Sequence, residues 1–291
     1  MLIRQRTILR LVEKAERPLT NTVLFKLVFL LRKETTLSED TAFYDFVPYH
    51  YGPYSFAMHR ELETLVSYGY LNAEKSSVGT HFTLGPVSID RALPPQNELA
   101  IDEILNRYAN VRQKELLRDV YERYSWYAIN TQLRELAPIA LPTPKCADSA
   151  IYTIGYHKSS VDSFANQLIA SGIQTVVDVR ANPISRKYGF AGSSLKTICN
   201  KVGLEYKHFP KLGIPSSARK GVSSDADFNR LFLNYQQQTL RNNREDVVNV
   251  SSLVRSSPSV LLCAEQDARS CHRSRLAFAI SEVTGLPIIN L

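Results

Sequence analysis

Two hydrophobic periodicities divide the chain, and the change between them falls near residue 150. In the first part, apolar residues recur every three or four positions, which is the spacing of one helix face. The pattern predicts two helices between residues 5 and 33, broken at Arg17-Pro18 because proline removes a backbone donor. Thr20 or Asn21 is the predicted amino cap of the second helix.

A third helix is predicted from Tyr54 to Gly69, followed by a polar hairpin that ends at Leu84. Helices followed by a small hairpin indicate a mainly helical, winged-helix-like domain. Two stretches, residues 46–55 (FVPYHYGPYS) and 60–71 (RELETLVSYGYL), resemble the YwgA-like and Panacea group of small helical modules.

Residues 95–137 are predicted to be helical and rich in charge pairs four residues apart. The strip Ala137–Lys145 contains three prolines and cannot continue a helix. We therefore predict a helical domain over residues 1–137, a proline-rich linker over 138–149 and a second domain over 150–291.

After residue 150, short β-branched segments alternate with amphipathic ones. This order predicts a mostly parallel sheet covered by helices on both faces, and so a Rossmann-like α/β fold. The predicted strands are Ile151–Ile154, Thr175–Val179, Leu204–His208, Ser259–Cys263 and Pro287–Asn290. The predicted helices are Val161–Ser171, Ser193–Lys201, Asp227–Leu240, Glu245–Arg255 and His272–Thr284.

The composition is that of a globular protein, since 44% of the residues are apolar. No apolar run approaches the roughly 20 residues that cross a bilayer, and the arginines near the start are not followed by the apolar segment of a signal peptide. The four cysteines lack paired spacing, which fits reduced thiols. We expect a cytoplasmic protein without a membrane partner; the sequence does not indicate its oligomeric state.

The net charge of +7 lies entirely in the second half of the chain. Residues 1–150 carry 18 basic and 18 acidic side chains, whereas residues 151–291 carry 17 and 10. A basic domain favours acidic partners such as a nucleotide or nucleic acid, because each Lys or Arg near a phosphate gains Coulomb energy. A merely basic surface explains the same charge equally well.

Reactive side chains are concentrated in residues 260–273 (VLLCAEQDARSCHR), between a predicted strand and a predicted helix. This is where open α/β sheets bind ligands. Glu265 is a candidate general acid or base, with a pKa that burial would raise, or alternatively a cap of the next helix. Cys271, beside an imidazole and a guanidinium, is a candidate nucleophile. The alternative is that Cys263 and Cys271 are small buried hydrophobes.

Asp178 and Arg180 alternate at the end of a buried strand, so their side chains face the same way. They form either an internal salt bridge that pins the following loop or part of a ligand site. In the ligand site, Arg180 and Arg186 clamp an anionic group, and Asp178 orients an arginine or accepts a sugar hydroxyl. The basic loop Lys211–Lys220 is either a lid over a phosphate-bearing ligand or a solvated surface loop.

Seven short motifs run in order through nearly all of residues 151–291. They are TIGY (153–156), VVDVRANPISR (176–186), GF (189–190), GLEYKH (203–208), LG (212–213), LLCAE (261–265) and CHR (271–273). Together these motifs resemble domain-of-unknown-function family 488. The resemblance implies a small Rossmann-like α/β fold and a cluster made of the DVR, SR and CAE…CHR motifs, with no settled activity.

Two other kinds of site are less well supported. Cys263 and Arg269 have the spacing of cysteine phosphatases, but no glycine lies between them to wrap a phosphate. A metal site from Cys263, Cys271, His272 and a distant histidine lacks the Cys-x-x-Cys spacing of structural zinc. Adjacent helical residues also point about 100° apart. We therefore predict no metal site, and the cofactor is unknown.

The leading hypothesis is an enzyme that acts on a nucleotide or nucleic acid by hydrolysis or transfer at a sugar or base, while the N-terminal domain recruits the substrate or a protein partner. The alternatives are a non-catalytic sensor or regulator and a cysteine-dependent phosphatase. The predicted catalytic residues are Glu265, Cys271, His272 and Asp178. The predicted substrate- or anion-binding residues are Tyr156, Arg180, Ser185, Arg186, Cys263 and Arg273.

Overall fold

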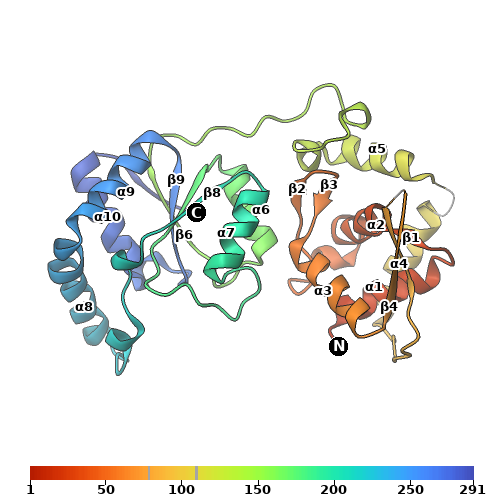
Figure 1. Cartoon of the computed structure of the whole chain (residues 1–291), viewed down its shortest axis with the longest axis horizontal. Helices are drawn as coiled ribbons and strands as arrows, with labels where there is room; N and C mark the ends of the chain where they lie inside the picture. The colour runs from red at the N-terminus through yellow and green to blue at the C-terminus, as the bar shows by residue number, and fades with distance from the viewer. Residues whose placement is uncertain (78, 109–110) are drawn as a thin grey trace. The chain divides into compact units, whose positions relative to one another are not determined.

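The computed structural model describes residues 1–77, 79–108 and 111–291, which form two compact units, Met1–Thr143 and Pro144–Leu291 (Figure 1). We call these units 1 and 2. Residues 78 and 109–110 fall within the predicted hairpin and the predicted helical stretch 95–137, and they lie outside the described residues.

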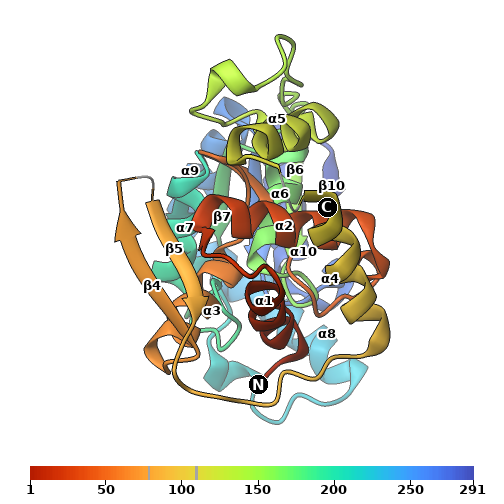
Figure 2. The ribbon, with the colours of Figure 1, turned by 90° about the vertical axis from the view of Figure 1, so that its right-hand side faces the viewer.

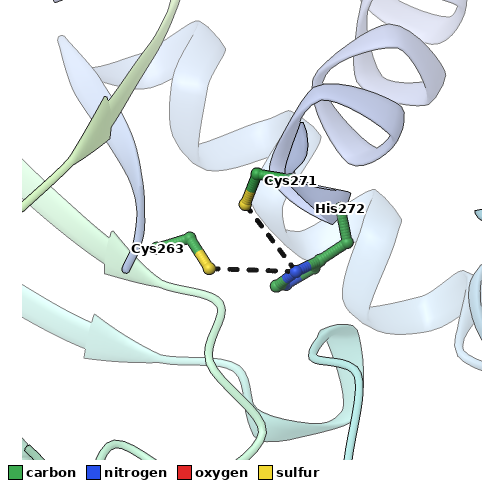
Figure 3. A group of neighbouring side chains, drawn as sticks. All are labelled: Cys263, Cys271 and His272. Atoms are coloured by element: carbon green, nitrogen blue, oxygen red, sulfur yellow. Dashed lines mark hydrogen bonds between the residues drawn. The ribbon is translucent and has the colours of Figure 1, made fainter. Parts of the chain in front are cut away.

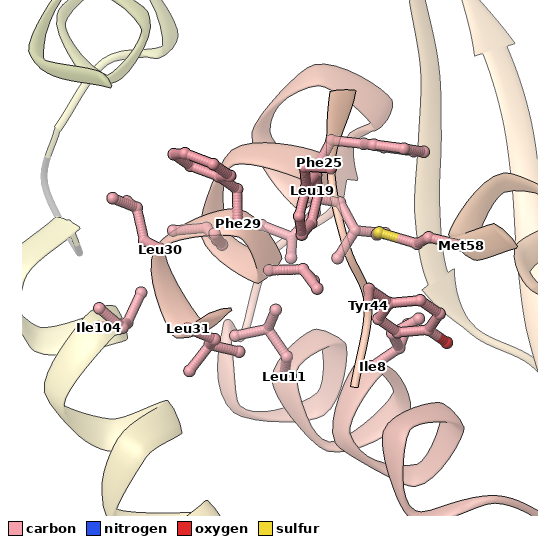
Figure 4. Close-up of a cluster of buried hydrophobic side chains, with 14 of the residues drawn as sticks. Ile8, Leu11, Leu19, Phe25, Phe29, Leu30, Leu31, Tyr44, Met58 and Ile104 are labelled. Carbon is pink, nitrogen blue, oxygen red and sulfur yellow. The ribbon is translucent and has the colours of Figure 1, made fainter. Parts of the chain in front are cut away.

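Unit 1 is built around one helix that is buried on all sides. This helix, α2 (Asn21–Glu34), buries every residue from 24 to 31, and all of these except Lys26 are apolar. A helix that is apolar all round belongs inside a core. Figure 4 shows Phe29 and Leu31 within this cluster. The part of α2 that packs in the core is therefore wider than the single apolar face predicted from the sequence. Of the two predicted amino caps, Thr20 is the one observed, because its hydroxyl accepts a hydrogen bond from the Val23 N–H.

The other elements of unit 1 surround α2. The antiparallel hairpin of β4 and β5 contacts α1, α2 and α3 (Figure 2), so helices and a hairpin occur in the predicted order. Strand β1 pairs with β5, and β2 pairs with β3. The helices are α1 (Ile3–Lys14), α3 (Phe56–Ser67), α4 (Pro95–Tyr108) and α5 (Gln113–Arg123). The strands are β1 (Leu19–Thr20), β2 (Val47–Tyr49), β3 (Gly52–Tyr54), β4 (Leu71–Ser76) and β5 (Gly79–Leu84).

Unit 2 is a five-stranded, all-parallel sheet in the order β10-β6-β9-β7-β8. Helices α6 and α7 cover one face, and α8, α9 and α10 cover the other (Figure 1). The predicted Rossmann-like α/β fold is confirmed. The strands are β6 (Ile151–Gly155), β7 (Thr175–Asp178), β8 (Glu205–His208), β9 (Ser259–Cys263) and β10 (Ile288–Asn290). The helices are α6 (Val161–Ala170), α7 (Gly192–Lys201), α8 (Asp225–Asn234) with its π-helical extension Tyr235–Leu240, α9 (Arg244–Ser256) and α10 (His272–Thr284).

The strand order places a topological switch point at β9. The chain leaves β6 through α6 toward one face of the sheet and leaves β9 through α10 toward the other, although β6 and β9 are neighbours. Connections that part in this way open a crevice at the C-terminal ends of the strands, where α/β proteins bind ligands. In the described part of the chain, no helix has the length and apolar character needed to cross a membrane.

Lys26 generates a prediction about unit 1. Its side chain is 2% exposed, its Nζ donates to the Pro53 carbonyl at 3.1 Å, and burial lowers its pKa to about 7. Because the unfolded pKa is about 10.4, the unfolded chain binds more protons between pH 7 and 10, and the stability of unit 1 rises with pH in that window. We expect Lys26→Met to remove this rise and to stabilise unit 1 by about 2–4 kcal/mol at pH 7.

Urea unfolding followed by fluorescence measures this effect, since Trp126 is the single tryptophan and lies in unit 1. Lys75→Met, at an exposed position on β4, is the matched control and should leave the pH dependence unchanged. An equal pH dependence in wild type and Lys26→Met would refute the assignment.

Candidate functional site

The polar side chains at the C-terminal edge of the sheet form two clusters. Asp178 on β7 is paired in register with Leu262 on β9, and residues paired in this way point to the same face. The next residue, Cys263, therefore points to the opposite face. Asp178 meets Arg180 and Tyr206 on β8, whereas Cys263 meets the start of α10. The single predicted cluster is thus divided between the two faces of the sheet.

The first cluster is the Asp178–Arg180 network. Arg180 donates to both Asp178 carboxylate oxygens, at 2.8 and 2.5 Å, and also to the Phe190 carbonyl at 2.9 Å and the Tyr156 hydroxyl at 3.1 Å. The Tyr206 hydroxyl donates to Asp178 at 2.6 Å. Asp178 is fully buried and Arg180 is 6% exposed. This arrangement is the internal salt bridge that pins the following loop, one of the two interpretations left open by the sequence.

The other predicted ligand-binding residues near this network have separate surroundings. The Tyr156 ring stacks on Phe190 with centroids 4.2 Å apart, beneath the Arg180 guanidinium. The Ser185 hydroxyl accepts a hydrogen bond from a backbone N–H of its own loop, and Arg186 on that loop is exposed. Arg180 is committed to protein partners while Arg186 faces solvent, so the structure gives no direct support to their predicted joint clamp.

The second cluster, which we call the thiol cluster, consists of Cys263, Glu265, Cys271 and His272. Both thiols donate to Oε2 of Glu265, at 3.0 and 3.1 Å. The two sulfurs lie 3.8 and 3.9 Å from Nδ1 of His272 (Figure 3). Arg219 donates to Oε1 of Glu265 at 2.6 Å. Two thiols, a carboxylate and an imidazole thus meet in the cluster, and the Arg219 guanidinium lies beside them.

The convergence of Cys271 and His272 corrects the geometry expected from the sequence. Cys271 is the amino cap of α10 and has extended backbone angles (φ −134°, ψ 139°), so it is not a helical residue. The separation of about 100° between neighbouring helical side chains therefore does not apply to this pair. Both side chains turn toward Cys263 instead (Figure 3).

Hydrogen bonds set the protonation state of Glu265. Burial alone would raise the pKa of this carboxyl, but the bonds donated by Cys263, Cys271 and Arg219 outweigh burial and lower the pKa to about 2. Glu265 is therefore ionised at neutral pH, contrary to the raised pKa expected from burial. The pKa of the Cys263 thiol is raised, first by its contact with Cys271 and then by burial. In the free protein both thiols are hydrogen-bond donors.

Arg273 and Gly155 hold the loop that carries Glu265. Arg273 is 1% exposed and donates to the backbone carbonyls of Glu265 and Gln266 and to the Thr153 hydroxyl. A Cβ atom on Gly155 would lie 1.8 Å from the Glu265 carbonyl oxygen, so only glycine permits this approach. Arg273, predicted to bind an anion, instead ties the loop after β9 to β6.

A cavity of about 350 Å³ borders the thiol cluster, within the range of roughly 300–1,000 Å³ typical of small-molecule sites. Arg219 of this wall belongs to the basic loop Lys211–Lys220, which was predicted to be either a lid over a ligand or a surface loop, although Arg219 was not among the predicted site residues. Phe228 and Phe232 were not predicted either, because their helix carries no motif that separates them from surface or core positions. The polar lining consists of Arg219, Glu265, Ser270, Cys271 and His272. The apolar lining consists of Ile214, Val222, Phe228, Leu231 and Phe232.

The structure does not bring together the two residues of the phosphatase hypothesis. The Arg269 side chain is 91% exposed and pairs with Asp267 at 3.0 Å, whereas Cys263 is buried at the end of β9. His157 is exposed, and the His208 ring contacts the Arg180 carbonyl, so neither histidine joins the thiol cluster.

An all-parallel sheet with polar side chains at its switch point defines unit 2 as a Rossmann-like α/β domain. Residues 160–280, which lie within unit 2, match the family model Domain of unknown function DUF488, as the motifs of this segment predict. The matched segment contains the thiol cluster and the Asp178–Arg180 pair. No curated protein and no solved structure matches the chain.

The buried charge pair gives a stability prediction. We expect Asp178→Asn to destabilise unit 2 by about 3 kcal/mol, because it leaves the Arg180 guanidinium buried without its counter-charge. Hydrogen exchange of the β9 amides in the full-length chain measures the opening of unit 2 separately from unit 1. The control is Lys207→Ala, which breaks the exposed pair with Glu205 on β8 and should cost less than about 1 kcal/mol. If both variants lowered the stability of unit 2 equally, the buried pair would not be the stabilising interaction.

Proposed function

We propose that unit 2 is an enzyme that binds a nucleotide or nucleic-acid fragment in the cavity beside the thiol cluster and hydrolyses it or transfers a group at its sugar or base. The observation that carries this proposal is the composition of the cavity wall. One set of lining residues is polar and includes Arg219, Glu265 and His272, and the other set is apolar and includes two phenylalanines. Convergent polar groups beside an apolar surface favour a ligand with both a charged and a flat apolar part.

A nucleotide has these two parts. The rings of Phe228 and Phe232 offer an apolar surface for a base, since aromatic side chains stack on any base. The Arg219 guanidinium is 41% exposed at the cavity and suits a phosphate, which it can bind through two parallel hydrogen bonds. The excess of basic over acidic residues in 151–291 also favours an anionic substrate.

Glu265 is the proton acceptor in this proposal, and Arg219 connects substrate binding to it. In the free protein, Oε1 of Glu265 accepts from Arg219 while Oε2 accepts from the two thiols. A substrate phosphate that draws Arg219 away leaves Oε1 free to accept a proton from the attacking group. His272 and Cys271 line the same cavity, next to the part of the substrate that reacts in this proposal.

Asp178 and Arg180 are positioning residues in this proposal. Their network fixes the end of β7 and the loop up to Phe190. The adjacent Val179 carbonyl accepts a hydrogen bond from the His272 ring at 3.1 Å, so the position of that ring depends on the same segment. We assign Arg273 the same kind of role, because it holds the loop of Glu265.

In this proposal, unit 1 recruits the substrate or a protein partner. Its helices followed by a hairpin support a winged-helix-like module, which would bind nucleic acid or a protein partner. The four free cysteines support a reducing compartment such as the cytoplasm.

Two variants separate substrate binding from turnover. Full-length protein is incubated with nucleoside phosphates, dinucleotides and short DNA and RNA, and product formation and thermal stabilisation are measured. We expect Arg219→Ala to weaken binding by about 10–100-fold, because a charged hydrogen bond to phosphate is lost. We expect Glu265→Gln to retain binding and to lower kcat by about 100-fold or more.

The control for both variants is Arg269→Ala, which removes a neighbouring arginine that does not line the cavity. Tight binding by the wild type without turnover of any compound would favour the alternative of a non-catalytic sensor. Binding that is equal in wild type and Arg219→Ala would reject the cavity as the nucleotide site.

A further inference from the structure

Three atoms of the thiol cluster are spaced like the ligands of a metal ion. The Cys263 sulfur, the Cys271 sulfur and Nδ1 of His272 lie within 4.8 Å of one another, and the two sulfur–nitrogen distances are 3.8 and 3.9 Å. A tetrahedral zinc ion, with Zn–S near 2.3 Å and Zn–N near 2.0–2.1 Å, separates sulfur and nitrogen by about 3.6 Å. The two sulfur–nitrogen distances are within a few tenths of an ångström of this value (Figure 3). The two sulfurs lie within 4.8 Å of each other, and a tetrahedral ion would bring them to about 3.8 Å.

The hydrogen bond between the His272 ring and the Val179 carbonyl orients the ring for metal binding. Its Nε2 lies 3.1 Å from the Val179 carbonyl oxygen, which can only accept, so Nε2 carries the proton. Nδ1 is then left with a lone pair, and it faces both sulfurs as well as a guanidinium nitrogen of Arg219 at 3.5 Å, which an ion would displace. Metal-binding histidines usually donate their other ring N–H to a carboxylate or a backbone carbonyl in this way, which fixes the tautomer and the ring orientation.

The backbone holds the three side chains in place. Cys263 ends the central strand β9, Cys271 caps α10 and His272 begins that helix. All three residues are at most 1% exposed. Ligands carried by rigid elements lose little conformational freedom when an ion binds, and burial protects thiolates from solvent.

We propose that Cys263, Cys271 and His272 bind one divalent ion of the zinc class through their two sulfurs and Nδ1, with the Glu265 carboxylate beside the fourth coordination position. Two thiol protons leave when the ion binds, because thiolates are the ligands. Three protein ligands and one open position are typical of catalytic zinc. Glu265, Cys271 and His272 also line the cavity, so the open position can be reached from it.

The consequence for chemistry rests on the proposed function. An ion held by Cys263, Cys271 and His272 would activate a water molecule, so that Glu265 would accept one of its protons and the remaining hydroxide would attack the electrophilic atom of the substrate. The bond from that atom to the leaving group breaks, and the proton on Glu265 passes to the leaving group. The sum is addition of water across the broken bond, so no oxidant or further reactant is needed.

Cobalt binding tests the site directly. Metal-free full-length protein is titrated with Co²⁺, whose coordination by thiolates produces a charge-transfer absorption, and Zn²⁺ is then added to displace it. We expect one ion per chain. Cys263→Ser and Cys271→Ser should each lower the affinity by about 100-fold or more and remove most of the absorption. Cys146→Ser, at an exposed cysteine outside the cluster, is the matched control and should bind like the wild type.

X-ray absorption of the zinc-loaded wild type is independent of how the variants fold. Two sulfur ligands and one imidazole nitrogen are expected; a zinc shell made only of nitrogen and oxygen would overturn the proposal. Absence of the cobalt absorption in folded wild type, or its persistence in a Cys263→Ser/Cys271→Ser double variant, would overturn it as well.

Activity separates this inference from the proposed function. One ion bound through two sulfurs, without turnover of any nucleotide, supports the metal site and rejects the proposed function. Turnover by metal-free protein in the presence of a chelator supports the proposed function and rejects the catalytic part of this inference. Glu265→Gln should keep the cobalt absorption while it loses turnover.

Discussion

The position of β9 between β6 and β7 is the constraint on which the rest of unit 2 depends. This pairing makes β9 the switch point of the sheet, because its two neighbours lead into α6 and α7 on the face opposite to α10. It also sets the register that places Asp178 beside Leu262. Since side chains alternate along a strand, that register sends Asp178 to one face and Cys263 to the other. Two clusters with separate partners result from one strand pairing.

The two clusters differ in how fully their polar groups are satisfied. Asp178 and Arg180 are almost completely buried and bond to each other and to Tyr156, Tyr206 and Phe190. A network of this kind makes a strand end rigid and leaves little capacity for a ligand. At the thiol cluster, the side chains of Glu265 and Arg219 are 29% and 41% exposed and meet a cavity. The rigid Asp178–Arg180 network therefore lies on one face of the sheet, and the thiol cluster, which a ligand can reach, lies on the other.

The sequence predicted those features that depend on local pattern. Alternating β-branched segments predicted all five strands of unit 2. The cap of α2 was narrowed to Thr20 or Asn21, and Thr20 fills it because its hydroxyl reaches a free N–H. Local patterns could not predict that the site is divided between the two faces of the sheet, because this division depends on the register between β7 and β9, which are about 80 residues apart in the chain. Arg219 reaches Glu265 from the basic loop Lys211–Lys220, and no pattern in that loop indicates which of its basic side chains does so. The low pKa of Glu265 arises from these same tertiary contacts.

The proposed metal site gives the thiol cluster a second state beside the hydrogen-bonded one. In the free protein each thiol donates a hydrogen bond to Glu265, which satisfies both buried thiols and one oxygen of the partly exposed carboxylate. Removing both thiol protons would leave two buried thiolates within about 3 Å of a carboxylate, and three negative charges so close together require compensation. Arg219 supplies a single positive charge, and it contacts Oε1 of Glu265 and Nδ1 of His272. A divalent ion between the sulfurs supplies the missing charge at the place where the repulsion arises. The same spacing that suits two thiol hydrogen bonds therefore also suits a metal ion.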